Sequence, residues 1–255
     1  MAIENLWEIG IILFMIFVSI LLIGSLVLAV TARKTTKSLG KIDIYGFSLA
    51  LFFLFIAIGY IIRIYFMFFL AKNDAEFLLQ MTATERSASL LPAYEADGRL
   101  ELLRSLWVIH MIFVFIGIGL LMFATEYKIL NKKSKFILTL IALGPLPAVL
   151  FLPYLIAQNF FYISYLAPFI WLFIYVSLAI KSTGSVRRNS IFLLVGFSIF
   201  VAGILFNSAT VRRIIFGAAG ENYISEIGAI FSVWFAPIML TGGFVLILLA
   251  LLNKF

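Results

Sequence analysis

Two ionisable residues lie inside long apolar stretches of this sequence, where a charge is costly and usually functional. Arg63 stands eight residues before the end of the stretch 44–71, and His110 stands eight residues after the start of the stretch 102–125. At about 1.5 Å per residue, each would lie about 12–13 Å below the same membrane surface. If the two helices are adjacent and antiparallel, a guanidinium and an imidazole meet there. Such a pair can bind an anion.

Helical spacing adds aromatic side chains to this pair. Tyr60 shares a face of its helix with Arg63, and Trp107 shares a face of the next helix with His110. Other polar residues in the outer third extend the candidate ligand-binding set to Tyr165, Asn207 and Glu226. We expect Glu226 to act as a counter-ion of Arg63, and we expect the ligand to be a small anionic or lipid-like molecule that enters from the outer side.

Structural roles are open for the same residues. Arg63 could extend its guanidinium to the lipid headgroups or pair with a loop acid. His110 could be a neutral core residue, hydrogen-bonded to Tyr60 or to a backbone carbonyl. Trp107 and Tyr165 could belong to the aromatic belt at the membrane interface.

The sequence lacks the residues that catalysis, metal binding or ion-coupled transport would need. The chain has no cysteine and a single histidine, which excludes disulfides, thiolate nucleophiles and Cys- or multi-His metal centres. No acidic residue lies near the middle of an apolar stretch, so an ion-coupled carrier has no obvious coupling group. We therefore expect no catalytic residues, no metal and no cofactor. We also expect the inner half of the bundle to be almost purely apolar.

The composition predicts an all-α, polytopic membrane protein. Of the 255 residues, 64% are hydrophobic and only 12% are charged, which excludes an ordinary soluble domain. A membrane-spanning helix needs about 20 mostly apolar residues. Seven stretches meet this requirement, at about 9–31, 44–71, 102–125, 136–157, 160–180, 190–210 and 224–252. We expect residues 1–255 to form one seven-helix transmembrane domain, located in the cell membrane.

The loop charges predict the orientation of the bundle. Twelve of the 19 lysines and arginines fall on the side reached by the loops after the first, third and fifth spans, with only two acidic residues, Asp43 and Glu126. The positive-inside rule then places the N-terminus outside and the C-terminus inside. The inner residues expected to contact the anionic leaflet, or a cytoplasmic or membrane protein partner, are Lys128, Lys132, Lys133, Arg187 and Arg188. The net charge of +7 is thus an orientation signal and does not indicate nucleic-acid binding.

Two further segments break the simple pattern. The outer loop 72–100 is long and alternates acidic residues with short apolar groups, which predicts a helical lid or a solvated loop. The fourth span contains Pro145, Pro147 and Pro153. Each proline removes a backbone hydrogen bond, so this span is the one expected to be distorted.

Three segments resemble a known type of membrane region. They are Gly59–Tyr65 (GYIIRIY), Glu126–Lys135 (EYKILNKKSK) and Leu143–Tyr154 (LGPLPAVLFLPY). In these the chain is similar to the seven-helix membrane sensor region of prokaryotic histidine kinases and its free-standing relatives. It does not resemble retinal-binding rhodopsins, because Tyr223–Leu252 contains no lysine, or standard G-protein-coupled receptors, whose Asn-Pro-x-x-Tyr motif is missing from the last span.

The resemblance implies a sensory role. Only Asn253–Phe255 follow the last span, so we expect any signal to pass to a separate protein. The sequence therefore predicts a receptor-like membrane protein that is not an enzyme. A structural subunit of a membrane complex and a small-molecule transporter are the alternatives.

Overall fold

The structure is a computed structural model that describes residues 3–70, 99–152, 160, 163–164, 166–206 and 234–252. These residues form helices and turns, and no strand occurs among them. The predicted all-α class is thus confirmed for the described part of the chain. Residues 72–98 of the outer loop predicted at 72–100, with its possible lid, lie outside the described residues, whereas residues 99 and 100 already belong to a helix. The boundary between the predicted spans 136–157 and 160–180 also lies outside the described residues.

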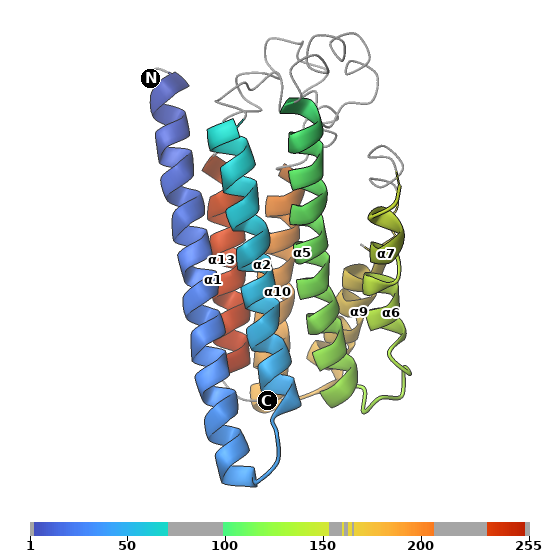
Figure 1. Cartoon of the computed structure of the whole chain (residues 1–255). Coiled ribbons are helices and arrows are strands. Elements are labelled where there is room, and N and C mark those ends of the chain that lie inside the picture. Colours follow the sequence, from blue (N-terminus) through green and yellow to red (C-terminus); the bar gives the residue numbers. More distant parts are fainter. Residues whose placement is uncertain are drawn as a thin grey trace.

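Seven helical segments follow one another in the described ranges (Figure 1). They are α1 (Ile3–Leu39), α2 (Ile44–Ile64) with the π-helix η1 (Tyr65–Leu70), α5 (Arg99–Lys128), α6 (Ile137–Leu143) with the short α7 (Leu146–Val149), α9 (Leu166–Lys181), α10 (Gly184–Phe206) and α13 (Ala236–Leu252). Each packs against the next in chain order, and α13 packs against α1, which closes the ring. The most extensive contacts are those of α2 with α5 and of α10 with α13.

Four described helices are long and apolar enough to cross a membrane: Glu8–Leu39, Ile44–Leu70, Arg104–Lys128 and Gly184–Ile204. Ile137–Val149, Leu166–Lys181 and Ala236–Leu252 are apolar but shorter. Large apolar side chains such as Phe173 and Ile180 are exposed on the outside of the bundle. A soluble protein rarely exposes so much apolar surface. The chain therefore has the features of an integral membrane protein.

The first helix is longer than its apolar stretch. The predicted span ends at residue 31, but α1 continues through Arg33 and Lys34 to Leu39. Lysine and arginine are good helix formers, and the helix ends only at Gly40, which adopts a φ of 65°. Asp43 then caps α2 by accepting a hydrogen bond from the amide of Gly46 at 3.0 Å. The predicted loop between the first two spans is thus mostly helix.

The fourth predicted span is broken, as its prolines indicate. Helix α6 ends at Leu143, and α7 begins only after Gly144 and Pro145. The distortion predicted for this span is confirmed within the described residues, which end at Leu152.

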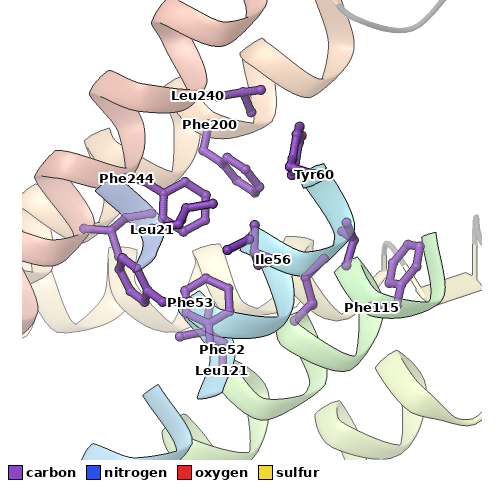
Figure 2. Packing of buried hydrophobic residues seen from close by; sticks show 14 of the residues in the cluster. Leu21, Phe52, Phe53, Ile56, Tyr60, Phe115, Leu121, Phe200, Leu240 and Phe244 are labelled. Atoms are coloured by element: carbon purple, nitrogen blue, oxygen red, sulfur yellow. The ribbon is translucent and has the colours of Figure 1, made fainter. Parts of the chain in front are cut away.

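Phenylalanine fills the centre of the bundle (Figure 2). The ring of Phe244 on α13 lies 4.7 Å from that of Phe200 on α10, and 5.3 and 5.6 Å from those of Phe53 and Phe52 on α2. Phe17 on α1 completes the contact at 5.5 Å. Each such pair contributes about 0.5–1.5 kcal/mol beyond its buried area. One aromatic cluster therefore joins four of the seven helical segments.

Glycines allow the two most extensive helix contacts. A Cβ on Gly196 of α10 would lie 2.8 Å from the carbonyl oxygen of Gly243 on α13. A Cβ on Gly117 of α5 would lie 3.1 Å from the carbonyl oxygen of Phe52 on α2. Close backbone approach through small residues is the usual means of packing helices in a membrane, where the hydrophobic effect does not drive their association.

Candidate functional site

The crossing of α2 and α5 places His110 against the backbone of α2. Gly59 has no side chain, and a Cβ there would lie 3.1 Å from the carbonyl oxygen of His110. The helices are therefore close enough for His110 Nδ1 to reach the carbonyl oxygen of Gly59 at 2.8 Å. Because a carbonyl oxygen only accepts, Nδ1 carries the hydrogen and donates it. His110 is only 2% exposed, so this bond fixes a buried imidazole ring.

Arg63 lies on the other side of the same imidazole. Its Nη1 is 3.5 Å from Nε2 of His110, and its Nε donates to the Sδ of Met67 at 3.3 Å. With Nδ1 protonated, Nε2 of a neutral imidazole is an acceptor, so the long Arg63–His110 contact has the guanidinium as donor. The guanidinium carbon also lies 5.9 Å from the ring centroid of Tyr60, within cation–π range.

Tyr60 connects this group to the first helix. Its ring is 4.8 Å from that of Phe17 and 6.2 Å from that of Phe14, both on α1, and 5.4 Å from the imidazole of His110. Tyr60 is only 3% exposed. We call Arg63, Tyr60 and His110, with the carbonyl of Gly59, the outer cluster, after the side of the membrane on which the sequence predicts it. Packing against Phe14 and Phe17 fixes the ring of Tyr60, and the guanidinium of Arg63 lies over that ring.

The structure therefore brings together three of the seven residues in the predicted binding set. Trp107, one turn before His110 on α5, is partly buried and packs against the hydrophobic core. Tyr165, Asn207 and Glu226 lie outside the described residues. The role of this set in binding a ligand stays a prediction.

A π-helix directly follows the outer cluster. The α-helical part of α2 ends at Ile64, and Tyr65–Leu70 continue as η1. Phe66 and Met67 of this segment are buried, and the ring of Phe66 lies 6.1 Å from the imidazole of His110. Wide turns of this kind are rare in helices and occur often at functional sites. The apolar pattern of the sequence does not predict this π-helix.

The expectation of an almost purely apolar inner half is wrong. Glu126, near the other end of α5, is fully buried, although the sequence predicts it in a loop. Its carboxylate accepts hydrogen bonds from the amides of Leu138 at 2.9 Å and Thr139 at 3.0 Å, and from the Thr139 hydroxyl at 2.6 Å. Helix α6 begins after Phe136, which has no capping side chain, so a carboxylate from the preceding helix takes that role. The sequence held one signal of this contact: Glu126 is the only acidic residue between Thr125 and the start of α6, which has no capping residue of its own.

A second buried polar contact joins α5 to α9 at this end. The indole Nε1 of Trp171 donates to the hydroxyl of Thr125 at 2.8 Å, and that hydroxyl donates to the carbonyl of Leu121 at 3.0 Å. The rings of Trp171 and Tyr175 are 4.3 Å apart. All these side chains are buried, so the contact holds α9 against α5.

The basic residues predicted to meet a partner lie at the same end. Lys133, Arg187 and Arg188 are exposed. The Nζ of Lys128 lies 4.8 Å from the ring centroid of Tyr45, and that of Lys132 lies 4.7 Å from that of Tyr127. Their contact with a partner stays a prediction.

Comparisons with known proteins found no protein-family model, no curated protein and no solved structure that matches the chain. Within the described ranges, no group of three or more His, Cys, Asp or Glu side chains lies close enough to hold a metal ion. The assignment of a function therefore depends on the geometry of the outer cluster.

Proposed function

We propose that the chain is a receptor-like or sensory membrane protein that binds a small anionic or lipid-like ligand from the outer side. One observation carries this proposal. A guanidinium, a buried imidazole and a buried tyrosine ring converge within an otherwise apolar helix crossing. Placing a cation in such surroundings is costly, and an arginine there usually marks a ligand site or pathway. An anion would be attracted to Arg63 by charge and held by the donors of its guanidinium.

We further propose that all seven helical segments cross the membrane, with the N-terminus outside. Their closed ring in chain order supports this count. The exposed basic residues gathered at one end support the orientation, since positive residues favour the cytoplasmic side.

The signal of a bound ligand has a direct route in this arrangement. Helix α5 carries His110 of the outer cluster and Glu126 at the inner end, sixteen residues or about 24 Å apart. An anion on Arg63 would compete with His110 for the guanidinium donors, and α5 would shift against α2. The basic inner end would pass that shift to a separate protein.

The topology is testable by labelling single introduced cysteines, because the chain has no cysteine of its own that would react. We expect a membrane-impermeant maleimide to label Ser87→Cys in intact cells. Ser38→Cys and Ser185→Cys, which are at exposed positions near the inner ends of α1 and α10, should be labelled only after permeabilisation. Labelling of Ser38→Cys from outside would reverse the orientation. Labelling of Ser38→Cys and Ser185→Cys from opposite sides would refute the number of crossings.

Ligand binding is testable by thermal stability of the purified protein. A ligand that binds only the folded state stabilises it by about 2.7 kcal/mol at a hundred times its Kd. We expect at least one compound from a panel of small carboxylates, phosphates and fatty acids to raise the Tm of the wild type. Arg63→Leu should abolish the rise and Arg63→Lys should weaken it. Arg33→Leu, which removes an exposed arginine of α1, is the matched control and should leave it intact. An equal rise in Arg63→Leu would contradict the site.

A further inference from the structure

The connection between α5 and α6 has an unusual backbone. Asn131, Lys132, Lys135 and Phe136 have φ values of 48°, 62°, 50° and 60°, in the left-handed region that non-glycine residues seldom adopt. Each of these conformations costs free energy, and such residues persist only where their surroundings hold them in place. A simple connector could have used glycine at these positions. We call Lys128–Phe136 the lysine turn.

Buried contacts hold the lysine turn in this shape. The backbone oxygen of Glu126 accepts from the amide of Lys132 at 2.8 Å, while its carboxylate binds the start of α6. Phe136 stacks on Phe123 of α5 with the ring centroids 5.3 Å apart. The position of the turn is thus set by a buried carboxylate and a ring on α5, and the lysines between them are presented on a fixed backbone.

The lysine turn combines cations with aromatic rings. Lys128, Lys132, Lys133 and Lys135 are exposed. The ammonium groups of the first two lie over the rings of Tyr45 and Tyr127. Tyrosine is enriched where the membrane meets water, so this end of the bundle has the composition of a headgroup region.

An exposed apolar stripe starts directly after the turn on α6 and resumes just after α7. It is formed by Ile137, Leu140, Leu150 and Phe151, which are 54%, 65%, 64% and 87% exposed. Ile137 and Leu140 lie one turn apart on α6, and Leu150 and Phe151 follow directly after α7. The cations therefore lie at the start of this stripe, whose exposed apolar side chains hydrocarbon would cover in a membrane.

We infer that the lysine turn and this stripe form a binding site for an anionic phospholipid. The lysines would take the phosphate headgroup, and an acyl chain would lie along the stripe. A soluble phosphate or an acidic peptide matches the lysines but leaves the stripe uncovered, whereas a zwitterionic lipid matches the stripe but lacks the net charge. This site is separate from the outer cluster and does not depend on the ligand proposed there.

The test uses the full-length protein in vesicles of phosphatidylcholine with a trace of phosphatidylglycerol that carries a diazirine in its acyl chain. After irradiation, we expect the probe on peptides within residues 137–151. A lysine near an anionic lipid contributes roughly a fivefold gain in binding, so Lys132→Ala/Lys133→Ala/Lys135→Ala should require about 100-fold more probe. Alanine has the same Cβ as lysine, so the backbone strain of the turn is unchanged.

The matched control removes three other exposed lysines from the same end, as Lys34→Ala/Lys37→Ala/Lys41→Ala. It should leave labelling of 137–151 within about twofold of the wild type, below the effect of a single lysine. Equal labelling by a phosphatidylcholine probe would overturn the inference, because the stripe would then be ordinary lipid-facing surface. Unchanged labelling in the turn variant, or full competition by inorganic phosphate, would overturn it as well.

Discussion

Valine in place of Gly243 is expected to destabilise the protein by about 3 kcal/mol or more, at the upper end of what overpacking costs. A Cβ at this position would lie 2.6 Å from the carbonyl oxygen of Gly196 and 2.7 Å from the amide nitrogen of Phe200. Both are backbone atoms of α10, so no side chain can rotate to relieve the clash. The two helices would have to separate, and the aromatic contact of Phe244 with Phe200 would loosen with them.

The adjacent glycine provides the control. A Cβ on Gly242 meets nothing within 4 Å, so Gly242→Val has the same side chain and nearly the same sequence position without the clash. We expect its Tm in detergent to equal or slightly exceed that of the wild type, because valine favours a helix more than glycine does. Equal Tm values for the two variants would show that α10 and α13 do not pack as described.

Alanine in place of Glu126 is expected to cost about 3 kcal/mol. The change leaves two amides and one hydroxyl, those of Leu138 and Thr139, without their acceptor in a buried region. Each buried donor left unsatisfied costs about 1–3 kcal/mol, and partial entry of water would reduce the sum. Because the carboxylate also fixes the start of α6, the lysine turn should lose its order.

Two milder variants test the origin of that loss. Glu126→Gln keeps the shape and one acceptor oxygen, and Thr139→Val removes only the hydroxyl donor, so both should cost less than Glu126→Ala. Thermal unfolding in detergent measures the stability. Hydrogen exchange of residues 129–140 measures the order of the turn, which should exchange faster in Glu126→Ala. A Tm of Glu126→Ala within the error of the wild type would mean that the carboxylate does not cap α6.

The apolar pattern was sufficient to predict the helical class and the approximate place of the helical segments in the described part of the chain, because runs of about 20 apolar residues have few alternatives in a membrane. The meeting of Arg63 with His110 followed from their equal depth together with the assumption that the two helices are adjacent and antiparallel, which the packing of α2 on α5 confirms. Gly59, the residue that permits the contact, lies four residues before Arg63 and therefore on the same face of the helix.

The features that the sequence did not reveal depend on tertiary contacts. Glu126 looks like one more loop charge until α6 is placed beside it. Three of the four left-handed residues of the lysine turn are lysine or phenylalanine, types that seldom adopt this conformation, and packing of Phe136 on Phe123 maintains it. Only Asn131 is of a type that favours it. The extension of α1 past its apolar stretch depends on helix propensity, which hydrophobicity does not report.

The most direct test of the binding site is native mass spectrometry of the tagged protein, extracted gently from its own membrane. We predict a monomer or homo-oligomer that carries a small adduct, which Arg63→Leu and His110→Ala remove and Arg33→Leu retains. A stoichiometric foreign polypeptide with no adduct would contradict it, and the chain would then be a structural subunit of a membrane complex.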